Sequence, residues 1–171
     1  MLVLLVIFWL AVAVIAYTFL GYPLLIGLLA RRRPHPVRQA EITPPLTLLI
    51  PAYNEAAVIA RKLGNSLGLD YPAHLLEIVV VADGSTDETV DIVSSYASRG
   101  VCLYHRPERR GKAAAINRVM PLLSGEIVVF TDANTLIERQ ALRRLVRNFA
   151  DPGVGGVNGE KRVLGGGEGL Y

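Results

Sequence analysis

The sequence predicts an α/β domain with a mostly parallel sheet and flanking helices, preceded by one transmembrane helix. Short apolar runs rich in β-branched residues alternate four times with segments of helical spacing, and such alternation implies parallel strands joined by right-handed crossovers. Polar residues gather directly after each apolar run. At the amino end, only Thr18 is conventionally polar between Leu2 and Phe19, and no charge precedes Arg31.

Residues 1–30 are long and apolar enough to cross a membrane as a helix, since about 20 apolar residues span a hydrocarbon core of about 30 Å. Gly21, Tyr22 and Pro23 interrupt the pattern near its end, where a kink is tolerated and an aromatic side chain can lie at the interface. A cleaved signal peptide carries its charges in front, whereas Arg31–Arg33 follow the apolar stretch. Positive flanks stay in the cytoplasm, so we expect a protein of the inner or plasma membrane with the rest of the chain inside. A buried core helix of a soluble protein is the alternative.

Residues 31–45 are basic and rich in proline, and they are expected to link the span to a domain at 46–171. The formal charge of +3 is modest and no nucleic-acid-binding signature accompanies it, so no nucleic acid partner is expected. Cys102 is the only cysteine and is expected as a small buried side chain. The three histidines lack the spacing of metal ligands, which argues against a zinc site.

Within this domain, the apolar runs and the helical spacing predict four strands and four helices in alternation. The strands are Leu46–Ile50, Leu75–Ala82, Val101–Tyr104 and Ile127–Thr131. The helices are Glu55–Leu67, Thr86–Ser98, Lys112–Leu123 and Glu138–Phe149. The fourth strand is typical of one buried on both faces of a parallel sheet. Ser85 or Thr86 is expected to cap the second helix, with Asp87 and Glu88 in its first turn, where negative charge suits the helix dipole.

Two phosphate-binding signatures are absent or incomplete. The dinucleotide fingerprint Gly-x-Gly-x-x-Gly is missing after the first strand, where Pro51–Glu55 stands instead. Gly165–Gly167 lacks the Lys-Ser/Thr that follows a phosphate loop of the Walker type, so it is expected to be a flexible loop.

Polar residues follow all four predicted strands and should meet at one edge of the sheet, because ligands of open α/β sheets collect outside the carboxyl ends of the strands. Carboxylates accept hydrogen bonds from a base or ribose and bind hard cations, while Arg and Lys neutralise phosphate. Together these residues predict a site for a nucleoside diphosphate and a metal. Taken singly, each also fits a turn former, a helix-start charge or a solvated loop. They are Tyr53, Asn54, Glu55, Asp83, Gly84, Ser85, Thr86, Asp87, Arg106, Arg109, Arg110, Gly111, Lys112, Asp132 and Asn134.

Four segments resemble, in the same order, the motifs of family 2 glycosyltransferases. They are Pro51–Glu55, Val81–Asp87, Arg110–Ala113 with Asn117, and Phe130–Asn134. The similarity extends from Leu46 to about Lys161. It implies the GT-A fold, which is Rossmann-like, a nucleotide-sugar donor that is commonly UDP-linked, and a divalent cation, Mg²⁺ or Mn²⁺. A membrane span ahead of such a domain is similar to the membrane-bound, processive-synthase-like branch.

The resemblance also implies roles for individual residues. Ala52, Tyr53 and Glu55 would border the nucleoside, with Glu55 towards the ribose, and Asp83 would meet the uracil. Arg110, Gly111 and Lys112 would complete the donor-binding set, with Lys112 near the diphosphate. Asp132 would be the first carboxylate of the Asp-x-Asp metal motif, and Asn134 departs from that motif at the second carboxylate position. An amide oxygen carries no negative charge, so we expect weaker metal binding or greater reliance on the donor's phosphates.

The inverting transfer that the family implies needs a carboxylate to deprotonate the acceptor hydroxyl. The family's base lies in a later motif, and Glu160 and Glu168, the only acids after Asp151, stand in no matching context. We therefore expect the base beyond Tyr171 and interpret the chain as the amino-terminal part of a longer enzyme, inactive by itself, that acts on a polysaccharide or glycolipid acceptor. A non-catalytic, membrane-anchored nucleotide-sugar-binding or scaffold protein is the main alternative. An unrelated nucleotide-binding enzyme such as a nucleotidyltransferase is a third.

Overall fold

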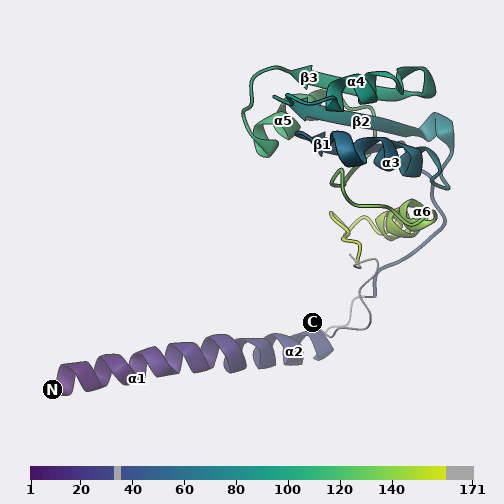
Figure 1. The fold of residues 1–171 in the computed structure, drawn as a ribbon. Coiled ribbons are helices and arrows are strands. Elements are labelled where there is room, and N and C mark those ends of the chain that lie inside the picture. The colour runs from purple at the N-terminus through teal and green to yellow at the C-terminus, as the bar shows by residue number, and fades with distance from the viewer. Residues whose placement is uncertain (33–35, 161–171) are drawn as a thin grey trace, which may run out of the picture. The chain divides into compact units, whose positions relative to one another are not determined.

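The computed structural model describes residues 1–32 and 36–160 and divides the chain into two units, Met1–Val37 and Arg38–Tyr171 (Figure 1). The first unit is one continuous helix over Leu2–Arg32. It consists of α1 (Leu2–Ala16), a π-helical turn (Tyr17–Gly21) and α2 (Tyr22–Arg32). By length and composition this is a candidate membrane span, and none of its residues is buried in the structure.

The π-helical turn ends at Gly21, the first residue of the interruption that the sequence predicts near the end of the apolar segment. Pro23 has no backbone N–H to donate, and a helix can absorb this loss by widening one turn. Within the wider turn, a Cβ on Gly21 would lie 2.9 Å from a ring carbon of Tyr17. Glycine therefore leaves room for the Tyr17 ring on the helix surface.

The second unit contains a four-stranded, fully parallel sheet with the order β3–β2–β1–β4. The strands are β1 (Leu46–Ala52), β2 (Leu76–Asp83), β3 (Val101–Arg106) and β4 (Ile127–Phe130). The helices between and after them are α3 (Ala56–Leu67), α4 (Thr89–Ser94), α5 (Lys112–Val119) and α6 (Ala141–Val146). Short 3-10 turns lie at Ala73–Leu75, Ala97–Arg99, Met120–Leu122 and Arg147–Ala150. The predicted alternation and the parallel sheet are confirmed.

Two apolar clusters cover the two faces of this sheet. On one face, Leu48 and Ile50 of β1 share a buried cluster with residues of α3, α4 and α6. On the other face, Leu49 of β1 and Val79 of β2 are buried with residues of α5. Figure 1 shows α3 and α4 side by side along the sheet. The chain thus leaves β1 on one face and enters β4 from the other, so β1 and β4 form the switch point at which ligands of such sheets bind.

Several local predictions are wrong. Within the described ranges β4 pairs only with β1, and Phe130 is 55% exposed, so β4 is an edge strand there and not one buried on both faces. An apolar run alone does not distinguish a central strand from an edge strand. Cys102 is exposed because β3 is the opposite edge of the sheet.

The predicted start of the second helix is wrong as well. Helix α4 begins at Thr89, and its N-cap residue, Glu88, makes no side-chain capping bond. The predicted caps Ser85 and Thr86 hydrogen bond instead to the loop after β1. The predicted flexible loop Gly165–Gly167 lies outside the described residues.

Candidate functional site

A cleft of about 380 Å³ opens at the carboxyl ends of β1, β2 and β4, at the switch point of the sheet. All but one of the predicted donor-binding and metal-binding residues line it. The lining residues are Pro51, Ala52, Tyr53, Glu55, Val81, Asp83, Arg109, Gly111, Lys112, Ala115, Asp132, Ala133 and Asn134. Segments that are up to 83 residues apart in the sequence therefore meet in one concave surface.

The loop between β1 and α3 is held by the segment that follows β2. Asn54 adopts a left-handed conformation, with φ of 53°, and its Oδ1 accepts a hydrogen bond from the Thr86 N–H at 2.8 Å. The Glu55 N–H donates to the Thr89 hydroxyl at 2.8 Å, and the Ala56 N–H donates to Asp87 at 3.1 Å. These bonds satisfy backbone donors at the start of α3. They leave the Tyr53 ring, 38% exposed, in the wall of the cleft.

Asp87 helps to hold the loop between β1 and α3 through both of its carboxylate oxygens. The Thr89 hydroxyl donates to its Oδ1 at 2.5 Å, while its Oδ2 accepts from the Ala56 N–H. The bond from Thr89 keeps the pKa of Asp87 below its usual value against a smaller opposing effect of desolvation, and the bonds from backbone N–H groups lower this pKa further. Asp87 is thus a charged anchor for the loop and does not line the cleft.

Asp83 ends β2 at the floor of the cleft and is 6% exposed. Its Oδ2 accepts hydrogen bonds from the backbone N–H groups of Arg110 at 2.8 Å and Gly111 at 2.7 Å. The carboxylate thereby ties the loop after β3 to the end of β2. Next to it, Gly84 has φ of +71°, and a Cβ there would lie 2.8 Å from the backbone nitrogen of Arg109, so a glycine lets the two loops approach.

This approach places the two neighbouring arginines differently. The Arg109 guanidinium lies over the Tyr53 ring, 3.8 Å from its centroid, in a cation–π contact within the cleft. Arg110 lines a second cavity of about 290 Å³ together with Arg106 and Arg118, on the other side of Asp83, which lines both. Arg110 is therefore the one predicted donor-binding residue that lies outside the main cleft. Arg109, which the resemblance did not select, takes a place in it.

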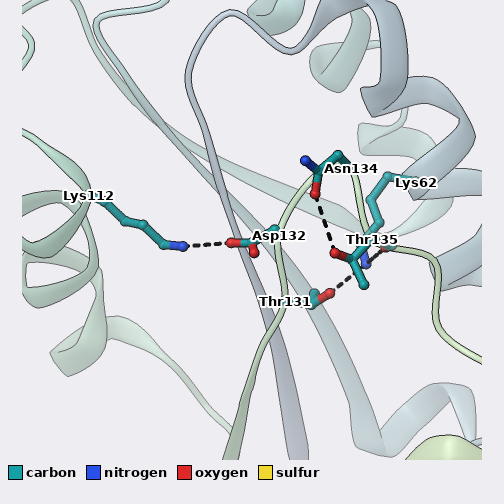
Figure 2. A network of polar contacts seen from close by, with 6 residues as sticks. All are labelled: Lys62, Lys112, Thr131, Asp132, Asn134 and Thr135. Atoms are coloured by element: carbon teal, nitrogen blue, oxygen red, sulfur yellow. Dashed lines mark hydrogen bonds and ion pairs between the residues drawn. The ribbon is translucent and has the colours of Figure 1, made fainter. Parts of the chain in front are cut away.

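Asp132 and Asn134 lie in the segment that leaves β4, and Figure 2 shows Lys112 of α5 pointing at Asp132 from across the cleft. The Lys112 Nζ lies 2.6 Å from the Asp132 Oδ1, with 62% and 51% of the two side chains exposed. The Asn134 Oδ1 accepts a hydrogen bond from the Thr135 hydroxyl at 3.3 Å. Because exposed ion pairs contribute only about 0–1 kcal/mol, ligands can readily replace the pairing of Lys112 with Asp132.

The donor atoms around Asp132 fit a hard divalent cation that shares its coordination sphere with a ligand. Residues 1–32 and 36–160 contain no group of three or more His, Cys, Asp or Glu side chains that could hold a metal. One carboxylate and one amide oxygen in an open cleft leave further positions for phosphate oxygens and water. Mg²⁺ and Mn²⁺ are commonly bound in this way, through one or two carboxylates plus substrate phosphates.

A buried lysine that the sequence analysis missed lies behind this segment. Lys62 in α3 is fully buried, and its Nζ donates to the Thr131 hydroxyl at 2.7 Å and to the Thr135 carbonyl oxygen at 2.5 Å (Figure 2). Burial lowers the pKa of Lys62 to about 8, against an opposing effect of the Asp132 charge. A signal was present in the sequence, since Lys62 shares the buried helical stripe with Ile59, Leu63 and Ser66.

The parallel sheet, its switch point and the polar cleft together define an α/β domain with a candidate ligand site at the switch point. The profile described as "Glycosyl transferase family 2" matches residues 47–171. The chain belongs to this family, as the motifs in the sequence predict.

Two curated relatives show how much of a whole protein this chain represents. The poly-β-1,6-N-acetyl-D-glucosamine synthase of Staphylococcus aureus strain COL is 32% identical over 120 residues, which are 69% of this chain and 29% of the relative. The β-monoglucosyldiacylglycerol synthase of Nostoc sp. strain PCC 7120 is 31% identical over 150 residues, 85% of this chain and 32% of the relative. The matched part is thus about a third of the length of either relative.

Solved structures confirm the fold. The mannosyltransferase PcManGT from Pyrobaculum calidifontis, in complex with GDP-Man and Mn²⁺, is 41% identical with a TM-score of 0.70, over 85% of this chain and 44% of that one. TarS residues 1–349 from S. aureus, in complex with UDP-GlcNAc, is 28% identical with a TM-score of 0.55, over 58% of this chain and 29% of that one.

Proposed function

We propose that this chain is the donor-binding part of a membrane-anchored glycosyltransferase that uses a UDP-sugar and a divalent metal for inverting sugar transfer. The cleft at the switch point carries the proposal, because it combines an aromatic ring, a buried carboxylate, a lysine and a metal-type oxygen pair. The named ligands of the similar structures are nucleotide sugars: GDP-Man with Mn²⁺ in one, and a UDP-sugar, UDP-GlcNAc, in the other.

The predicted donor-binding residues of the cleft each have a part in this proposal. Ala52, Tyr53 and Glu55 border the nucleoside, and the base stacks at the Tyr53 face that Arg109 occupies in the structure. Asp83 meets the base with its Oδ1, since its Oδ2 is engaged by the backbone of the loop after β3.

The charged side chains of the cleft would lie around the phosphates of the donor. Asp132 and Asn134 would hold Mg²⁺ or Mn²⁺, and the bound cation would supply Lewis-acid stabilisation of the negative charge on the leaving diphosphate. Lys112, at 2.6 Å from Asp132, can donate to a phosphate oxygen from the start of α5, next to Gly111. Arg110 belongs to the proposed donor-binding set through its backbone N–H, which holds Asp83.

The division of the chain into two units supports a proposed organisation into anchor, linker and domain. Residues 1–30 would anchor the protein in the inner or plasma membrane, 31–45 would link the anchor to the domain, and 46–171 would hold the donor in the cytoplasm. Arg31 and Arg32 at the end of α2 support this orientation. The catalytic base and the acceptor site, for a polysaccharide or glycolipid, are expected beyond residue 171, because the matched part is only about a third of each curated relative.

Thermal unfolding with a panel of nucleoside diphosphates tests this proposal. A ligand at 100 times its dissociation constant adds about 2.7 kcal/mol to the free energy of unfolding, so UDP with Mn²⁺ should raise the melting temperature by several degrees. The expected order is UDP above GDP and ADP, with the shift reduced by EDTA. Asp132→Asn should lose the metal dependence, whereas Asp91→Asn, an exposed carboxylate of α4 outside the cleft, should retain it. No shift with any nucleoside diphosphate would contradict the proposal.

A further inference from the structure

The segment that carries Asp132 and Asn134 has little regular structure of its own. After Phe130, the last residue of β4, the chain contains turns but no helix or strand until α6 begins at Ala141. Its backbone bonds to the sheet stop early, with the Thr131 N–H donating to the Leu49 carbonyl oxygen at 3.1 Å. Ligands on such a segment need support from side chains elsewhere to keep their positions.

Helix α3 supplies that support through two side chains on one face. Asn65 accepts a hydrogen bond from the Ile137 N–H at 2.8 Å and donates to the Ile137 carbonyl oxygen at 2.9 Å. Lys62, three residues earlier and so on the same face of the helix, binds Thr131 and Thr135. Asn65 thus fixes the later part of the segment, and Lys62 fixes the part with the two predicted metal ligands.

The two acceptors of Lys62 stand on either side of these ligands. One acceptor precedes Asp132 by one residue and the other follows Asn134 by one residue. A single ammonium group therefore binds both ends of the five-residue stretch 131–135 (Figure 2). A charged group in a buried position is costly unless its hydrogen bonds are made, and an apolar side chain of similar volume would avoid this cost. Packing alone therefore does not explain a lysine at this position.

We infer that Lys62 is a positioning residue for the metal site, a role that rests on the proposed function of Asp132 and Asn134. Its two hydrogen bonds hold both ends of residues 131–135, and thereby keep Asp132 and Asn134 in the lining of the cleft. The charge of Lys62 by itself would repel a divalent cation. Positioning and charge therefore predict opposite effects when Lys62 is replaced.

Mn²⁺ affinity in the presence of saturating UDP distinguishes the two effects. It is measured by electron paramagnetic resonance of free Mn²⁺, with the full chain in detergent, below the melting temperature of each variant. Lys62→Met keeps an unbranched side chain that is one atom shorter but removes its donors and charge. It should raise the Mn²⁺ dissociation constant about 10-fold or more, the usual effect of losing an outer-shell partner. Asn65→Ala, the matched control, removes two hydrogen bonds from the same helix but none next to the ligands, and should change this constant less than about 3-fold.

The outcomes separate the inference from the proposed function. Equal effects of Lys62→Met and Asn65→Ala on Mn²⁺ affinity would show a general structural role for Lys62. Tighter Mn²⁺ binding by Lys62→Met would show that the charge effect dominates. Either result overturns the inference but leaves the proposed function intact, provided that the wild-type protein binds Mn²⁺ and UDP. Wild-type protein that binds neither Mn²⁺ nor UDP would overturn the proposed function and the inference with it. If Lys62→Met does not fold, Thr131→Val removes one of the two acceptors while leaving the charge. It should weaken Mn²⁺ binding to a smaller extent, and unchanged binding would overturn the inference.

Discussion

Replacing Lys112 by methionine should move two affinities in opposite directions. The change removes the ammonium group that lies 2.6 Å from Asp132 while keeping an unbranched side chain that is one atom shorter. Without nucleotide, Mn²⁺ competes with Lys112 for Asp132. Both side chains are more than half exposed, and such pairs contribute about 0.2–1 kcal/mol. The variant should therefore bind Mn²⁺ up to about 5-fold more tightly when nucleotide is absent.

The same change, Lys112→Met, should lower the affinity for UDP. A hydrogen bond between charged groups contributes about 1.5–3 kcal/mol, so loss of the bond from Lys112 to the diphosphate should lower UDP affinity about 10- to 150-fold. Paramagnetic resonance measures the Mn²⁺ affinity, and isothermal titration calorimetry measures the UDP affinity. Arg144→Met, which removes an exposed ion pair of α6 with Glu138 at 3.3 Å, is the control and should change neither. If Lys112→Met shifts both affinities in the same direction, the assignment of Lys112 to both partners is refuted.

Three further predictions concern stability and the base site. Gly125→Ala should destabilise the fold by about 1–3 kcal/mol in chemical denaturation, because a Cβ would lie 2.3 Å from a backbone nitrogen of β1. Gly64→Ala in α3 is the control; it has open space around it and should stabilise the fold by about 0.5–1 kcal/mol. Lys62 has a pKa of about 8 in the folded state and 10.5 as its ordinary value, so the unfolded state binds more protons between these two pH values. The free energy of unfolding should therefore rise with pH across that window, by up to about 3 kcal/mol relative to Lys62→Met. A parallel pH profile of the two proteins would contradict this. Arg109→Ala should alter UDP affinity in calorimetry without changing Mn²⁺ affinity, because Arg109 contacts the Tyr53 face and lies on the base side of the cleft; an equal change in both would disprove that location.

The strand pattern could be predicted because it depends on local composition. Apolar runs followed by polar residues identified the four strands, and the rule that parallel strands end at one edge of the sheet placed Asp83 and Asp132 in the same cleft. The place of a strand in the sheet depends on its partners. For this reason, the run at Ile127 was mistaken for a strand buried on both faces.

Other features depend on contacts that sequence spacing does not reveal. Arg109 and Arg110 are adjacent and chemically identical, yet they face different cavities because Asp83 binds the backbone of their loop and Gly84 lets that loop approach. Lys62 was missed because its partners, 69 and 73 residues away in the sequence, come next to it only in the folded chain. A charged residue in the buried stripe of a helix was its one visible signal.

The most direct measurement of the central claim is calorimetric titration of UDP into the full chain, with Mn²⁺ and with EDTA, for the wild-type protein and Asp132→Ala. We predict that the wild-type protein binds UDP markedly more tightly with Mn²⁺, and that Asp132→Ala shows one weak affinity under both conditions. Equal affinity with and without metal in the wild-type protein, or undiminished Mn²⁺-dependent binding by Asp132→Ala, would contradict a metal-assisted nucleotide-sugar site at the end of β4.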